Sequence, residues 1–420
     1  MWHRVIHLTL LVLIAAVLPA RAETHLKDDD VVAVCGDSIT EQKLYSMYIE
    51  DYLLMCKPKQ GIRTAQFGWG GEVAPGFLSR MTNDVLWLKP TVVTTCYGMN
   101  DGGYSPMDEA KAKRYRAATR EIVKKFKEAG VRTIIVGSPG AVDTDFFRRG
   151  NGGAEMYNKT LSELRDIAKQ VAEEEGVLFA NVFDAMYTAM PKAKAKLGNQ
   201  YHVCGPDGFH PAPNGHLIMA YAFLKAMGCD GNIGTITLDA QSGKAEATEG
   251  HKLLSSDSAS VEVESTRYPF CFYGNESSPD GTRSIVPFLP FNEELNRYTL
   301  VVKNANAPRV KVTWGNASKE FAAEELAKGI NLAAEFVVEN PFSEPFRKVE
   351  QVVRLQQNYE TPLHKNFLHN LAPYYQLVPE EREALDRIAG KVQAKDKELF
   401  DQAAAAVKPV KHVIKIEAVR

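Results

Sequence analysis

Two short segments of the chain carry side chains that could act together in nucleophilic catalysis. Ser38 follows Gly36 and Asp37 in a turn after an apolar run, and Asp207 stands three residues before His210 in a later loop. A serine hydroxyl becomes a nucleophile when a histidine accepts its proton, and a carboxylate orients that histidine. The residue types therefore suggest Ser38 as the nucleophile, His210 as the base and Asp207 as the orienting carboxylate.

Two further turns could stabilise the oxyanion that forms when a serine attacks a carbonyl group. Gly70 and Gly71 follow the second apolar run, and glycine lets a backbone N–H approach a substrate closely. We prefer Gly71 as the donor, with Gly70 as the alternative. Asn100, in Gly98-Met99-Asn100-Asp101, carries a side-chain amide that can also donate. Such donors are needed in fixed positions before the charge develops.

Each of these residues also has a purely structural interpretation. Ser38 could cap the following helix, Gly71 could serve a tight turn, and Asn100 could cap a helix or form an Asx turn. The combination favours catalysis. From average composition, Gly-Asp-Ser, Gly-x-Asn-Asp and Asp-x-x-His occur together at strand ends in fewer than about one chain in a hundred.

Apolar runs alternate with helical periodicity between Val31 and Met227. Apolar residues recur at three- and four-residue spacing in 107–129 and 154–175, and Gly130 and Gly176 end these two predicted helices. This alternation predicts a parallel sheet covered on both faces, a three-layer α/β domain. Its carboxyl edge, where such folds bind ligands, would carry the candidate residues. The predicted strands cover 31–35, 62–67, 91–97, 131–137 and 177–182.

The chain changes character after Cys229. Residues 230–248 are rich in Gly, Thr and Ala and are interpreted as a boundary. Helical periodicity returns from about 322 to 407, with a charged amphipathic stretch at 379–407. Strand-like alternation occupies 258–264, 267–273, 297–303 and 309–314, and the last two segments could pair around the turn at 304–308.

We therefore predict a catalytic domain over 23–229 and a β-plus-α extension over 230–420. The extension would hold strands at about 235–318 and helices at about 322–407. Its aromatic run Tyr268–Tyr273 could be a binding strand, although buried core is the favoured interpretation. The sequence does not reveal what the extension does.

Residues 1–22 have the pattern of a secretory signal peptide. The first four residues are short and basic, Leu8–Ala20 is almost wholly apolar, and Ala20-Arg21-Ala22 is a cleavage pattern. A retained signal anchor is the alternative, but the apolar run is short for a membrane span. The pattern predicts a secreted or periplasmic protein with no membrane attachment after cleavage.

Composition narrows the choice of partners. The 420 residues carry a formal net charge of −2, which gives no electrostatic reason to expect nucleic acid as a partner. Export permits disulfides, and among six cysteines the pair Cys204–Cys229 is the one we predict. Because CxxC, HExxH and aspartate-rich calcium motifs are absent from the sequence, we expect no metal and no other cofactor.

The motifs resemble the four conserved blocks of the SGNH (GDSL-like) hydrolase family. The resemblance covers roughly residues 30–229 and implies a flavodoxin-like α/β/α fold. It also implies ester hydrolysis through an acyl-enzyme on Ser38, with oxyanion donors from the Ser38 N–H, the Gly71 N–H and the Asn100 side chain. The matching segments are Gly36-Asp37-Ser38-Ile39, Gly71, Gly98-Met99-Asn100-Asp101 and Asp207-Gly208-Phe209-His210.

The substrate is less well defined by the sequence. An exported, near-neutral chain without a long lipid-binding segment favours a small-molecule or polysaccharide ester, and Asp37, Trp69, Tyr97 and Asp101 are candidate substrate neighbours. By resemblance to secreted carbohydrate esterases, we predict removal of O-acyl groups, most simply acetyl, from a polysaccharide. The alternatives are a lipase, arylesterase or thioesterase, a cell-wall O-acetyltransferase, or a glycan-binding or scaffold protein that uses residues 230–420.

Overall fold

A computed structural model describes residues 24–419. The predicted signal peptide, residues 1–22, lies outside these described residues. No helix within 24–419 combines the length and the apolar character needed to cross a bilayer.

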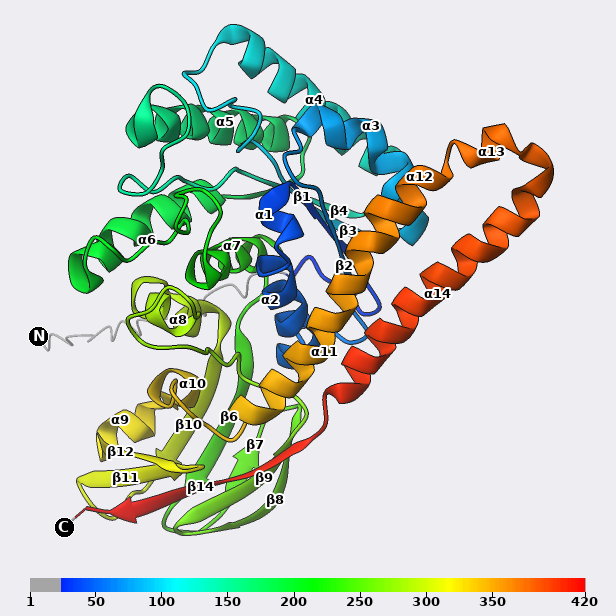
Figure 1. Ribbon diagram of the computed structural model, residues 1–420. Coiled ribbons are helices and arrows are strands. Elements are labelled where there is room, and N and C mark those ends of the chain that lie inside the picture. The colour runs from blue at the N-terminus through cyan, green and yellow to red at the C-terminus, as the bar shows by residue number, and fades with distance from the viewer. Residues whose placement is uncertain (1–23, 420) are drawn as a thin grey trace, which may run out of the picture.

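Five parallel strands form the sheet at the centre of the N-terminal half (Figure 1). Their order is β2-β1-β3-β4-β5, and every neighbouring pair is parallel. Their runs of Val, Ile and other apolar residues are buried, as expected for a sheet covered on both faces. All five lie within or beside the predicted runs: β1 (Val31–Gly36), β2 (Arg63–Gly68), β3 (Val92–Cys96), β4 (Thr133–Gly137) and β5 (Leu178–Ala180).

Helices cover both faces of this sheet, which gives the predicted α/β/α sandwich. Helices α3, α4 and α5 pack in sequence on one side, while α2, α7 and α6 pack on the other. Gly130 and Gly176, at φ values of 80° and 61°, follow α4 and α5 as predicted. The helices are α1 (Ser38–Glu41), α2 (Tyr45–Asp51), α3 (Ala74–Asp84), α4 (Glu109–Glu128), α5 (Gly153–Glu174), α6 (Val182–Leu197) and α7 (Pro213–Ala226).

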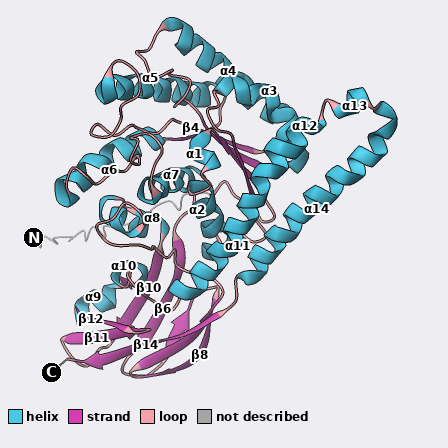
Figure 2. Cartoon of the chain, viewed as in Figure 1, coloured by secondary structure: helices cyan, strands magenta, loops and turns pink. Residues whose placement is uncertain are grey.

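The extension contains two further sheets (Figure 2). One has the order β13-β10-β6-β7 and the other β12-β11-β14-β9-β8. Short helices α8 (Phe291–Leu295) and α9 (Ala323–Lys328) connect strands of the two sheets, and α10 (Leu332–Glu335) follows the last strand of the first. The strands are β6 (Asn232–Asp239), β7 (Ala245–Ala247), β8 (His251–Asp257), β9 (Ser260–Ser265), β10 (Arg297–Lys303), β11 (Arg309–Trp314), β12 (Ala317–Ala322), β13 (Ile330–Asn331) and β14 (Val410–Ala418).

Strands β6 and β7 occupy the segment 230–248 at the start of the predicted strand region, and Ile233, Ile236 and Leu238 of β6 are buried. One pairing predicted for the extension is wrong. The predicted pairing of 297–303 with 309–314 does not form: β10 pairs with β6 and β13, whereas β11 pairs with β12 and β14. The intervening turn instead carries the chain from one sheet to the other.

Two more segments differ from expectation. Residues 267–273 form no strand. The side chains of Tyr268, Phe270 and Phe272 are buried, and that of Tyr273 is partly buried. The backbone N–H of Phe270 donates to the Asn296 side chain over 2.7 Å. The favoured interpretation of this run as core is therefore confirmed. Strand β14, which follows the predicted helices, is absent from the prediction, although it lies between β11 and β9.

A helical hairpin returns from the extension to the first sheet, where α11 lies beside α2 and β2 (Figure 1). Strand β2 is an edge strand, so part of its backbone lacks a strand partner. The Gln356 side chain donates to the Thr64 carbonyl over 3.1 Å, and Glu360 accepts from the Gln66 N–H over 2.8 Å. The hairpin comprises α11 (Ser343–Thr361), a π-helical segment (Pro362–Leu368), α12 (His369–Leu371), α13 (Tyr374–Leu377) and α14 (Arg382–Ala406).

The predicted disulfide is wrong, because Cys204 and Cys229 are both buried free thiols. Cys204 precedes α7 and Cys229 follows it. A helix of this length spans about 20 Å, whereas a disulfide needs Cα atoms within about 7 Å of each other.

Candidate active site

The structure brings Ser38, His210 and Asp207 together at the carboxyl edge of the first sheet. Ser38 is the first residue of α1, directly after β1. Its Oγ lies 2.8 Å from His210 Nε2, and His210 Nδ1 lies 2.7 Å from Asp207 Oδ2. Such a chain of hydrogen bonds allows a histidine to take a proton from a serine while a carboxylate faces its other nitrogen.

Asp37, rather than Ser38, caps α1. The Asp37 carboxylate accepts from the Ile39 N–H over 3.0 Å, which leaves the Ser38 hydroxyl to its contact with His210. The interpretation of Ser38 as a simple helix cap is therefore wrong. Burial raises the pKa of Asp37 to about 7, and the charges of Asp101 and Glu72 act in the same direction. The carboxyl group faces the protein interior, so Asp37 is not an open contact for substrate.

The loop before α7 requires glycine at two positions. Gly205 and Gly208 have φ values of 76° and 82°. A Cβ atom on Gly205 would lie 1.8 Å from the His210 carbonyl oxygen, and one on Gly208 would lie 2.3 Å from the Phe147 nitrogen. The tight turn places the Asp207 carboxylate against the backbone and ring of His210. Partial burial would raise the pKa of Asp207, but hydrogen bonds from the His210 backbone and ring and from Phe209 lower it below its usual value.

The Asn100 amide joins the turns that follow β1 and β2. Its Nδ2 donates to the Glu72 carbonyl over 3.0 Å and lies 3.4 Å from Asp37 Oδ2. The Tyr104 hydroxyl donates to Asn100 Oδ1 over 2.8 Å. Since Tyr104 occupies the oxygen, the nitrogen is directed toward the turns that hold Ser38 and Gly71. A donor in that position suits a developing oxyanion.

Contacts of the buried Glu72 side chain fix the glycine turn after β2. Gly71 is exposed with a φ of 72°, and the next residue, Glu72, is buried. Glu72 makes a two-pronged ion pair with Arg80, at 2.6 and 2.7 Å, and also accepts from the Tyr97 hydroxyl over 2.8 Å. Gly70, the alternative donor, packs toward Glu41, whose Oε2 would lie 2.8 Å from an added Cβ. The role of the Gly71 N–H stays a prediction.

Tyr97 and Asp101, two of the candidate substrate neighbours, are buried. Their exposed fractions are 3% and 1%. The Tyr97 ring stacks on Phe77 with the centroids 5.2 Å apart, while Asp101 accepts from the N–H groups of Ala74 and Gly98 over 3.0 and 3.1 Å. Both residues follow the central strand β3, and their buried side chains contact neighbouring elements of the domain.

Comparison with known proteins identifies the family of the N-terminal half. The model of the GDSL-like lipase/acylhydrolase family matches residues 34–218. This segment is a GDSL-like hydrolase domain. The chain is also 29% identical over 194 residues to an acetylxylan esterase of Geobacillus stearothermophilus, which covers 44% of this chain and 80% of that protein. The protein is therefore an ester hydrolase.

The fold of the whole chain, extension included, occurs in another enzyme. A gut microbial diltiazem-metabolizing enzyme matches 95% of this chain and 100% of its own with a TM-score of 0.73 at 21% identity. The N-terminal half and the extension therefore occur together in the fold of another protein.

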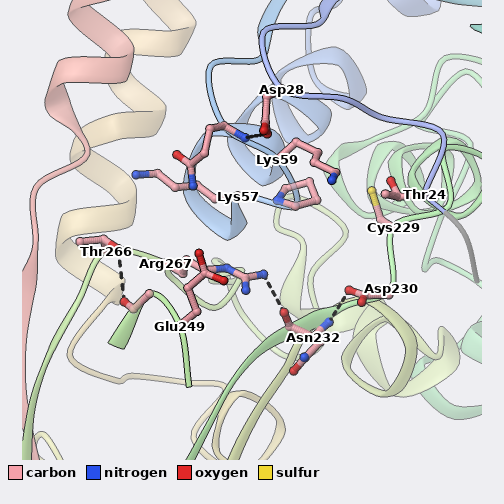
Figure 3. A pocket seen from close by; sticks show the side chains of 13 residues that line it. Thr24, Asp28, Lys57, Lys59, Cys229, Asp230, Asn232, Glu249, Thr266 and Arg267 are labelled. Atoms are coloured by element: carbon pink, nitrogen blue, oxygen red, sulfur yellow. Dashed lines mark hydrogen bonds between the residues drawn. The ribbon is translucent and has the colours of Figure 1, made fainter. Parts of the chain in front are cut away.

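None of the proposed catalytic residues lines the cavity drawn in Figure 3. It measures about 830 Å³ and is bordered by residues 57–60, which precede β2, and by Asp28, which precedes β1. These residues stand at the amino end of the parallel strands, whereas Ser38 follows the carboxyl end of β1. Arg267 at its border donates to the Asn232 carbonyl over 2.6 Å. We therefore place the active site of the GDSL-like domain at the carboxyl end of the strands and not in this cavity.

Two features near the catalytic residues were not assigned from the sequence. Arg80 lies among the apolar positions of α3, and a lone arginine on such a face signals a buried carboxylate partner such as Glu72. His369 comes from the extension, 300 residues beyond Trp69, and no local pattern in the sequence connects them.

Proposed function

We propose that the protein is a secreted carbohydrate esterase that removes acetyl groups from a polysaccharide through an acyl-enzyme on Ser38. The observation that carries the catalytic part is the continuous hydrogen-bonded chain Ser38–His210–Asp207. The similarity to an acetylxylan esterase supports an acetylated glycan as substrate. The signal-peptide pattern of residues 1–22 supports export.

The proposed reaction has two halves. Ser38 Oγ attacks the ester carbonyl while His210 Nε2 takes its proton, and N–H donors from Ser38, Gly71 and Asn100 stabilise the oxyanion. The carbon–oxygen bond to the sugar then breaks, and His210 returns the proton to the leaving alcohol. Water attacks the acyl-enzyme in the same way, releasing acetate and regenerating Ser38.

The direct test is acetate release by the full chain from acetylated xylan and from 4-nitrophenyl acetate. We expect Ser38→Ala to lower kcat on both substrates by at least about a thousandfold. Ser258→Ala, at an exposed position between β8 and β9, is the matched control and should retain parental turnover. Parental activity in Ser38→Ala would refute the acyl-enzyme. Turnover of the aryl ester alone would refute the glycan substrate.

Export has a test of its own. The full-length chain should appear outside the cytoplasm with a new N-terminus at Glu23. Retention with Met1 still present would contradict the proposal.

A further inference from the structure

A cavity of about 300 Å³ lies beside the glycine turn of the proposed active site. Trp69, Gly70, Gly71 and Ser79 line one part of it, and His369 of the extension lines another. Since liquid water occupies about 30 Å³ per molecule, the space equals that of roughly ten waters. This is far more than the methyl group of an acetyl ester needs. A cavity of this size next to the oxyanion turn suits the alcohol part of a substrate.

The His369 ring is held in a fixed orientation at this cavity. Its Nδ1 lies 2.9 Å from Oδ2 of Asp84, whose side chain is fully buried. The ring meets Trp69 edge-on with the centroids 4.8 Å apart. Because a carboxylate accepts hydrogen bonds, the proton on His369 Nδ1 lies between the ring and Asp84. The His369 side chain is 39% exposed. Its Nε2 has no hydrogen-bond partner among residues 24–419, so this atom is available to a ligand.

The extension is anchored at this point, so His369 cannot move far. Lys365 forms an ion pair with Glu41 at 2.7 Å and lies 5.0 Å from the centre of the Trp69 ring. One residue before α12, the Leu368 carbonyl accepts from the Asn83 side chain over 3.0 Å. Because Glu41 stands only three residues after Ser38, these contacts tie the extension to the edge of the active site.

The charges around the cavity are already paired, which argues for a neutral ligand. Arg80 is neutralised by Glu72 and by Asp84, at 2.6 and 3.5 Å. Lys365 is neutralised by Glu41. What remains is a set of polar groups outside these ion pairs: His369 Nε2, the backbone of the glycine turn and the exposed Ser79 hydroxyl, which donates to the Gly76 carbonyl over 2.7 Å. Such groups recognise hydroxyl groups rather than a carboxylate or a phosphate.

We infer that this cavity binds a sugar ring of the alcohol part of the ester, and that His369 hydrogen-bonds one of its hydroxyl groups. The extension thereby supplies a specificity-determining residue to a site whose catalytic residues all come from the GDSL-like domain. This inference rests on the proposed function, because it assumes a glycan ester bound at Ser38.

The test compares a substrate that fills the cavity with one that does not. We expect His369→Ala to raise KM for acetylated xylo-oligosaccharides roughly threefold to tenfold, the usual worth of one neutral hydrogen bond. kcat/KM for 4-nitrophenyl acetate should change less than about twofold. His369→Gln, which keeps a hydrogen-bonding amide, should recover part of the lost affinity. His25→Ala, an exposed histidine before β1, is the matched control.

Each outcome supports or overturns the inference. Equal losses on both substrates would show that His369 only supports the fold or the oxyanion turn, and unchanged kinetics on the oligosaccharide would remove it from the subsite. His369→Ala could loosen the contact with Trp69, so thermal unfolding is measured for both variants. If His369→Ala does not fold, the kinetics of His369→Gln decide the outcome. A parent that cleaves the aryl ester but no sugar acetate would refute the glycan ester and the subsite together.

Discussion

Carboxylates occupy opposite environments at the catalytic edge and at the interface between α2 and α11. Asp207 is 44% exposed, and hydrogen bonds from His210 and Phe209 keep its pKa low. Glu50 is fully buried, and its Oε1 has no hydrogen-bond partner within residues 24–419. Burial raises the pKa of Glu50 to about 8, against the hydrogen bond that Gln357 donates over 2.7 Å. Solvent and donors keep one group ionised, whereas burial keeps the other protonated.

The interface continues this pattern beyond Glu50. Burial also raises the pKa values of Asp51 and Glu360, both of which are fully buried. Neither carboxylate oxygen of Asp51 has a hydrogen-bond partner in the described part of the chain. The comparison therefore predicts a separation of effects. Changes at the catalytic edge should alter turnover and leave stability unchanged, while changes at the interface should alter stability and its dependence on pH.

The largest expected effect lies at Asp207. Asp207→Asn keeps a hydrogen-bond acceptor but loses the charge that orients and stabilises His210, so kcat should fall about a thousandfold to ten-thousandfold. Thermal unfolding should remain close to that of the parent, because the side chain is exposed. Asp401→Asn, on the exposed face of α14, is the control. A large loss of stability in Asp207→Asn would show that effects on turnover and on stability are not separate at the catalytic edge.

The next effect is expected at Asn100. Removing one oxyanion donor costs about a hundredfold to a thousandfold in turnover. We expect Asn100→Ala to lower kcat by that factor with little change in KM for 4-nitrophenyl acetate. A loss confined to KM would indicate that the amide binds substrate in the ground state.

At the interface, Glu50→Gln should change stability and leave kcat unchanged. Glu50 keeps its proton up to about pH 8 in the folded chain but ionises near 4.5 when unfolded. The folded state therefore holds more protons between these values. The stability that Glu50 contributes is complete below about pH 4.5 and is lost as the pH rises toward 8. Glutamine stays neutral, so at pH 8 the variant should be more stable than the parent by about 1–3 kcal/mol.

Thermal or urea unfolding between pH 5 and pH 8 measures this difference, which should shrink toward pH 5. Glu383→Gln at the exposed start of α14 should follow the parent at every pH. If the free energies of unfolding of Glu50→Gln and of the parent change with pH in parallel, Glu50 does not keep its proton in the folded chain.

The smallest expected effect is at Tyr104. Tyr104→Phe removes the donor that holds Asn100 Oδ1, so the amide is free to turn and kcat should fall about threefold to tenfold. In an Asn100→Ala background the same change should have no further effect, because the group that Tyr104 positions is absent. Additive losses in this cycle would give Tyr104 a role independent of Asn100.

The N-terminal half was predictable because its signals are local. An apolar run followed by a polar turn identifies both a strand and its carboxyl end, and parallel strands place those ends along one edge. Ser38, Asn100, Asp207 and His210 could therefore be grouped before any contact was known. The positions of Tyr97 and Asp101 could not, because the side chains that continue a strand do not show whether they point to solvent or to the interior.

The extension was harder to predict because its contacts join distant segments. Strands β10 and β11 are neighbours in sequence, yet they belong to different sheets, where β10 pairs with β6 and β11 pairs with β14. Strand β14 completes a sheet whose other members lie about 100 residues or more earlier.

The sequence alone determined the order of strands and helices to residue 229 and the chemistry at their ends. Hydrophobic periodicity and turn residues act over a few positions, so they can be recognised without knowing the fold. Tertiary structure decided which helix covers the β2 edge, where His369 lies and why Cys204 and Cys229 remain apart. These outcomes depend on complementary packing and hydrogen bonds between segments as much as 333 residues apart, and no short stretch of sequence contains that information.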